Sequence, residues 1–141
     1  MDCMTLRDKK QYVLPIVLEC LKDQEDEERR LTGVILVDEL AQSLGSEICR
    51  EHIMYDFISL QEDPIFKIRR EVALRLMRVS RVLGEQIFNG VIIPVYKKLS
   101  QDQIWSVRKA CVEMLPEISR ISSQQMKKGQ IMQLFKRFSQ D

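Results

Sequence analysis

The side chains best suited to chemistry are few and widely separated. The cysteines, Cys3, Cys20, Cys49 and Cys111, include no C-x-x-C pair, and His52 is the single histidine. A zinc site needs about four such ligands at short spacings, so the sequence predicts no metal site. His52 has neither a serine nor a cysteine next to it, and no phosphate-binding loop, dinucleotide fingerprint or nucleophile elbow is present. We therefore predict a noncatalytic protein with no catalytic residue, metal or cofactor. An enzyme whose site is assembled from distant residues is the alternative.

Two aromatic residues favour protein binding over catalysis. Phe66 and Trp105 are separated by 39 positions, with Lys67 and Lys109 close to them in the sequence. Each ring falls at the start of a predicted helix, where the apolar stripe of that helix does not require a core residue. Large rigid side chains bury much area at small entropic cost, so we predict that these four residues, the turn ridge, contact a partner. The alternative is that each ring packs over its own repeat junction.

Arginines form two further patterns. Arg30, Arg69 and Arg108 recur every 39 positions, and Arg69 and Arg108 each follow an aspartate of the preceding turn, Asp63 or Asp102. We interpret this column as structural, because an arginine beside the aspartate of the neighbouring turn can donate charge-assisted hydrogen bonds that set the stacking of repeats.

The second arginine pattern is a basic face. At 100° per residue, one arc of a helix carries Lys67, Arg70, Arg78 and Arg81. Such a face suits an acidic partner. However, Glu39 and Glu117 lie one period on either side of Arg78, and this alternation favours ion pairs between layers.

Composition limits the classes of protein that remain. The chain has 141 residues, of which 45% are hydrophobic and 30% charged, with five glycines and four prolines. These values fit one soluble domain and argue against disorder or a β-sandwich. The net charge is +1, but residues 1–62 hold 7 basic and 14 acidic side chains (−7), whereas residues 63–141 hold 15 and 7 (+8). No apolar run approaches the ~20 residues of a membrane span, and the N-terminus lacks a signal-peptide core, so we expect a cytoplasmic protein, with the nucleus as a further location.

An internal repeat decides the fold. Apolar residues recur every 39 positions without any insertion. The columns include Leu21, Leu60, Leu99 and Phe138; Leu14, Ile53, Ile92 and Ile131; and Leu40, Val79 and Ile118. Self-similarity at this period is typical of repeats that bury their apolar faces only by stacking on neighbours.

Each repeat is predicted to be a pair of helices. Apolar spacings of three and four give units at about residues 12–44, 46–83 and 85–121, with a half repeat at 124–141 and a charged lead-in at 1–11. Asp63 and Asp102 are predicted N-caps, with Pro64 at the first helical position, and Gly45 and Gly84 are predicted to end helices. The other prolines, Pro15, Pro94 and Pro116, should kink helices or mark their ends. The sequence thus predicts a single all-α domain over residues 1–141, an α-solenoid of about three and a half repeats.

The turn motif resembles the HEAT repeat. The stretches that carry the resemblance are Asp102-Gln-Ile-Trp-Ser-Val-Arg108 and Asp63-Pro-Ile-Phe-Lys-Ile-Arg69. The preceding segment from Ile92 to Asp102 is similar to the proline-kinked first helix of the scaffold and regulatory subunits of phosphatase 2A-type enzymes, and Val91 to Asp141 particularly resembles phosphatase 4 regulatory subunits. The first unit departs from the motif, with Gln24 in the aspartate column.

The resemblance implies a partner. It predicts a noncatalytic scaffold or regulatory subunit that binds a phosphatase 4 or 2A-type catalytic subunit through the intra-repeat turns. One alternative is an adaptor for another protein, in transport or chromosome organisation, that uses the basic face. Another is self-association through the C-terminal edge, residues 131–138. Nucleic acid is a weaker prediction, because the basic residues have no stacking aromatic platform beside them.

Overall fold

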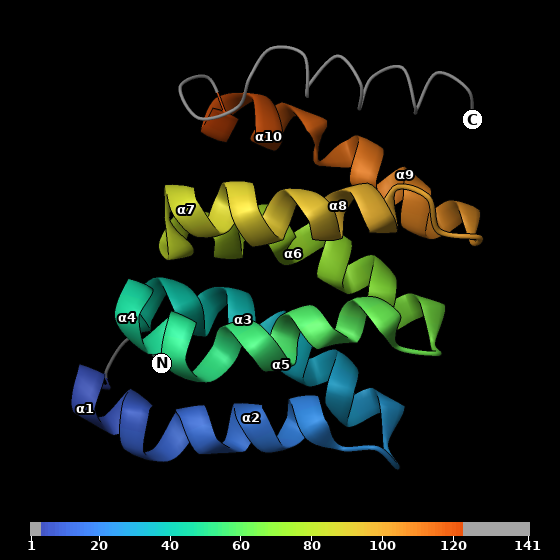
Figure 1. The fold of residues 1–141 in the computed structure, drawn as a ribbon. Coiled ribbons are helices and arrows are strands. Elements are labelled where there is room, and N and C mark those ends of the chain that lie inside the picture. The colour runs from blue at the N-terminus through green and yellow to red at the C-terminus, as the bar shows by residue number, and fades with distance from the viewer. Residues whose placement is uncertain (1–3, 123–141) are drawn as a thin grey trace.

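Three helical hairpins stack side by side in a computed structural model that describes residues 4–122 (Figure 1). Among those residues there is no strand, and no helix is long and apolar enough to cross a membrane. The predicted half repeat and the apolar C-terminal edge lie outside the described residues. The fold is an all-α solenoid of HEAT-like hairpins, as the periodicity of the sequence predicted.

The first helix of each hairpin is interrupted by one π-helical turn. In hairpin one, α1 (Leu6–Asp8) runs through the π-helical turn Lys9–Val13 into α2 (Leu14–Lys22). In hairpin two, α4 (Ser46–Ile48), the turn Cys49–Ile53 and α5 (Met54–Ser59) end in a 3₁₀ turn, Leu60–Glu62. In hairpin three, α7 (Glu85–Ile87) and the turn Phe88–Ile92 lead into α8 (Ile93–Leu99).

The prolines explain only part of these interruptions. Pro15 and Pro94 lie at the second position of α2 and α8, where their missing N–H groups follow a wide turn. The second hairpin has the same turn although Met54 and Tyr55 occupy those positions, so proline accommodates the π-helical turn but is not required for it.

The second helices line up in one layer. They are α3 (Glu27–Leu44), α6 (Phe66–Leu83) and the pair α9 (Trp105–Glu113) and α10 (Leu115–Ser122). The break between α9 and α10 falls at Met114, two residues before Pro116, which occupies the second position of α10 and so lies next to a helix end, as predicted. Helix α6 packs against both α3 and α9, and each second helix packs on its own first helix.

The apolar columns form the core. Leu40, Val79 and Ile118 are 0%, 0% and 1% exposed, so one position of the repeat is buried in all three second helices. Burying such a side chain contributes roughly 1.5–3 kcal/mol. Gly45 and Gly84 end α3 and α6 with φ of 87° and 94°, the left-handed region predicted for them.

Two local expectations need correction. The first helix begins at Leu6, not near Tyr12, because the Thr5 hydroxyl caps it by accepting the Asp8 N–H at 3.1 Å. Asp63 and Asp102 are not N-caps: α6 and α9 begin at Phe66 and Trp105, with an isoleucine at each cap position and no side-chain hydrogen bond there. Pro64 therefore precedes α6 and is not its first residue. The Asp63 carboxylate faces another hairpin instead.

Candidate protein-binding surface

The turns between paired helices lie along one edge of the solenoid, at the right of the view in Figure 1. Asp63 and Asp102 shape the second and third turns, since each carboxylate accepts the N–H two residues on, from Ile65 and Ile104, at 2.9 Å. These short Asx turns leave α6 and α9 to start with Phe66 and Trp105.

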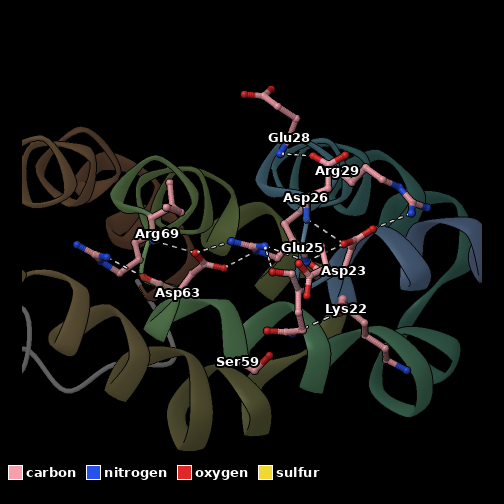
Figure 2. Close-up of polar contacts among 12 residues, drawn as sticks. Lys22, Asp23, Glu25, Asp26, Glu28, Arg29, Ser59, Asp63 and Arg69 are labelled. Atoms are coloured by element: carbon pink, nitrogen blue, oxygen red, sulfur yellow. Dashed lines mark hydrogen bonds and ion pairs between the residues drawn. The ribbon is translucent and has the colours of Figure 1, made fainter.

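An Asp–Arg ladder, made of the pairs Arg30–Asp63 and Arg69–Asp102, joins successive turns. Arg30 donates from Nε and Nη2 to Asp63 at 2.8 and 3.3 Å, and Arg69 donates to Asp102 in the same way at 2.7 and 3.1 Å. Figure 2 shows Asp63 with Arg69 of the same hairpin next to it. The bidentate geometry fixes each turn against the next, which confirms the structural interpretation of this arginine column.

Each arginine also holds its own turn. Arg69 Nη1 donates to the Asp63 carbonyl at 2.7 Å, and Arg108 Nη1 donates to the Asp102 carbonyl at 2.7 Å. Burial alone raises the pKa of Asp102, but hydrogen bonds from Arg69 and the Ile104 N–H outweigh this effect and leave the pKa below its ordinary value of 3.8. The turns are therefore rigid mounts for the residues that follow them.

The first turn is built differently, as the missing aspartate predicted. Asp23, one position before Gln24, accepts the N–H groups of Glu25 and Asp26, and these bonds lower its pKa. Its second oxygen pairs with Arg29 of the same hairpin at 2.7 Å. Asp26 then caps α3. Figure 2 shows this self-contained turn beside Asp63.

The ridge aromatics are solvent-exposed. Trp105 is 60% exposed and Phe66 36% exposed. Lys109 Nζ lies 5.4 Å from the centre of the Trp105 ring, and Lys67 is exposed beside Phe66. The structure therefore places all four turn-ridge residues on the surface, on the second helices of adjacent hairpins.

Sequence reasoning missed one member of this surface. Ile104, immediately before Trp105, is 40% exposed. Ile104 lies one period after Ile65, which is half-buried against the core. The repeat pattern therefore predicted that Ile104 packs in the core as well. An isoleucine at a cap position, where a polar residue is usual, was the signal that could have identified it.

A groove of about 490 Å³ separates the second and third turns. It is lined by Glu62, Pro64, Lys98, Gln101 and other turn residues. The Lys98 ammonium pairs with Glu62 across the two hairpins. The ridge thus alternates exposed rings with a polar hollow.

The basic face is only partly free. Arg78 Nη1 lies 3.1 Å from Asp38, and Arg81 pairs with Glu117. Arg70 borders a separate hollow between α6 and α9. The predicted ion pairs between layers form, but their partners differ: Arg78 pairs with Asp38 and not Glu39, and Glu117 pairs with Arg81. Asp38 points between the layers and takes Arg78, whereas Glu39, 100° further round α3, is exposed.

In the part of the chain that the structure describes, His52 and the buried cysteines lie apart from one another. His52 is exposed with Glu51 at 3.7 Å. Burial raises the pKa of the Cys49 thiol to about 11 and that of Cys111 to about 12. No cluster of three or more potential metal ligands occurs within residues 4–122.

Comparison with known sequences supports the repeat. Residues 92–122, which span α8 to α10, match the family described as HEAT repeat. A search of curated proteins finds no match. The matched stretch contains Trp105 and Lys109, and a similar pattern stands one period earlier around Phe66 and Lys67.

Proposed function

We propose that this chain is a noncatalytic scaffold that binds a phosphatase 4 or 2A-type catalytic subunit through the turn ridge. HEAT repeats typically mediate protein–protein interactions, which supports the general role. The particular partner rests on the resemblance of residues 91–141 to phosphatase regulatory subunits. Any metal would belong to the catalytic subunit.

The observation that carries the proposal is the exposure of Trp105 on a rigid mount. Because the Trp105 ring is 60% exposed, a partner that covers it removes a large apolar area from water. The Asp–Arg ladder already fixes the turn that carries Trp105, so little order has to be gained on binding. Lys109 against the ring leaves a positive charge at the edge of the contact, which suits an acidic rim on the partner.

Calorimetry with purified phosphatase 4 and 2A catalytic subunits tests the proposal. The variant Phe66→Ala/Trp105→Ala should weaken binding at least ~30-fold, because truncation of a central aromatic anchor costs about 2 kcal/mol or more. The matched control is Tyr12→Ala/Tyr55→Ala, which removes two exposed rings from the first helices. Wild-type chain that fails to bind either subunit contradicts the proposed partner, and equal losses in both variants contradict the proposed ridge.

One observation favours a second function, that of an adaptor for another protein. Arg78 and Arg81 border a separate groove on the layer of second helices, away from the turns. Guanidinium groups at the border of a groove suit a partner with acidic side chains.

A further inference from the structure

A second groove lies on the layer formed by α3, α6 and α10, which are neighbours in the stack of Figure 1. It encloses about 490 Å³. Its lining consists of Asp38, Leu74, Arg75, Arg78, Arg81, Met114 and Glu117. We refer to it as the arginine groove.

A buried carboxylate fixes the arginines of this groove. Asp38 is 2% exposed, and its Oδ2 lies 3.1 Å from Nη1 of both Arg75 and Arg78. Arg75 is held a second time by Glu71 at 3.2 Å. A charge buried to this degree is stable only with such partners, so Asp38 positions the two guanidinium groups. The groove is consequently preorganised for a ligand.

Two guanidinium groups keep donors available to a ligand. The Arg78 side chain is 58% exposed and the Arg81 side chain 45% exposed. Each guanidinium carries five N–H donors, and each of these arginines uses only one nitrogen in its ion pair with Asp38 or Glu117. The remaining donors can bind oxygen acceptors in a bidentate manner.

The floor and the charge balance restrict the ligand further. Leu74 and Met114 supply apolar surface, and three guanidinium groups face the two carboxylates of Asp38 and Glu117. Residues 63–122 as a whole carry 11 basic and 6 acidic side chains. A ligand with carboxylates around an apolar side chain would complement both features.

We propose that the arginine groove binds an acidic linear segment of a partner protein, in which Asp or Glu residues flank one apolar residue. Carboxylates of the segment pair with Arg78 and Arg81, and its apolar side chain contacts Leu74 and Met114. A nucleic acid fits less well, because the lining residues within 4–122 include no aromatic ring for base stacking and Glu117 repels a continuous chain of phosphates.

Fluorescence anisotropy with a set of labelled eight-residue peptides tests this proposal. Each peptide has one leucine and three or four glutamates at varied spacings, and a lysine version serves as the negative probe. At least one glutamate peptide should bind the wild-type chain. Arg78→Gln/Arg81→Gln should weaken that binding at least ~10-fold, as expected for the loss of charge-assisted hydrogen bonds.

Three controls make the result specific. Arg7→Gln/Arg50→Gln removes the same charge from exposed sites on the first helices and should change affinity less than ~2-fold, because screened distant charges contribute little. Glu117→Gln should strengthen binding, since it removes the carboxylate that competes for Arg81. Trp105→Ala should leave peptide binding unchanged, so this proposal can fail or succeed independently of the phosphatase proposal.

Several outcomes overturn the inference. These are no binding by any glutamate peptide, equal losses in the two double arginine variants, or weaker binding by Glu117→Gln. Complete displacement of the peptide by a single-stranded oligonucleotide at equal charge also overturns it, in favour of a phosphate-binding face. Circular dichroism of each variant confirms that helicity is intact before binding is compared.

Discussion

Replacement of Asp63 by alanine should destabilise the whole stack more than any exposed charge substitution. In the Arg30–Asp63 pair the side chains are only 8% and 4% exposed, and two hydrogen bonds join them. Removing one partner of a buried pair costs about 3–5 kcal/mol, because the other charge is left uncompensated. The Ile65 N–H also loses its acceptor, at a further ~1 kcal/mol.

The hydrogen bonds that Arg30 keeps in Asp63→Ala place the expected loss of stability near the lower end of the ~3–5 kcal/mol range. Its Nη1 still donates to the carbonyls of Asp23 and Gln24, at 2.9 and 3.4 Å. We therefore expect a loss of about 3 kcal/mol, a large part of the ~5–15 kcal/mol typical of a domain. Asp102→Ala should cost less, since in its pair with Arg69 the side chains are 10% and 16% exposed.

Urea unfolding at pH 7, followed by circular dichroism, measures the effect. The double variant Arg30→Met/Asp63→Ala should recover at least ~1 kcal/mol relative to the sum of the single changes, because no buried charge is then left alone. Glu62→Ala is the control, since its pair with Lys98 is exposed and the midpoint should hardly move. A loss below ~1 kcal/mol for Asp63→Ala, or the absence of coupling with Arg30, would refute the reasoning.

Three further predictions concern other parts of the fold. Gly33→Ala should destabilise the chain by ~1–3 kcal/mol in urea, because the added Cβ would lie 3.0–3.1 Å from atoms of α2. Gly90→Ala should instead stabilise the chain by ~0.5–1 kcal/mol, because the added Cβ would meet no atom within 4 Å beyond its chain neighbours and its own helix backbone. Asp102 has a folded pKa below its ordinary 3.8, so its contribution to stability is present above about pH 4 and is lost as the pH falls through the folded pKa. Asp102→Asn should therefore flatten acid unfolding followed by circular dichroism, and an unchanged acid slope would contradict this. In a variant without the other two cysteines, Cys49 and Cys111 should react with Ellman's reagent at pH 8 only after unfolding, since burial raises their pKa values to about 11 and 12, and rapid reaction of the native chain would show that the thiols are accessible.

The sequence was sufficient to predict the solenoid because the apolar columns of the repeat form the core between hairpins. The same residues that recur every 39 positions, such as Leu40 and Val79, are those buried between hairpins. The exposure of Trp105 also followed from the pattern, since the core stripe of its helix did not require a ring at that position.

The pattern did not reveal features that depend on backbone hydrogen bonds or on small rotations. The π-helical turn Cys49–Ile53 is not followed by a proline, so the sequence carried no signal for it. The side chains of Asp38 and Glu39 differ by 100° around α3, and the alternation of charges alone selected the wrong one. Asp38 lies in the same repeat column as Met77 and Pro116, and Met77 is buried. An acidic residue in a column that is buried in the next repeat could have predicted the internal ion pair.

The Asp–Arg ladder makes repeat number adjustable. Each junction uses an arginine from one unit and an aspartate 33 positions further along the chain, in the same geometry at Arg30–Asp63 and Arg69–Asp102. Excision of residues 46–84, one whole period, would bring Arg30 opposite Asp102 and so keep this pair, whereas Asp38 would lose Arg75 and Arg78 and face Met114 and Glu117 in their columns. Duplication of a unit would likewise create one more pair of the same kind. Unequal recombination could thus shorten or lengthen such an array in steps of one period while each junction keeps its Asp–Arg pair at the turn.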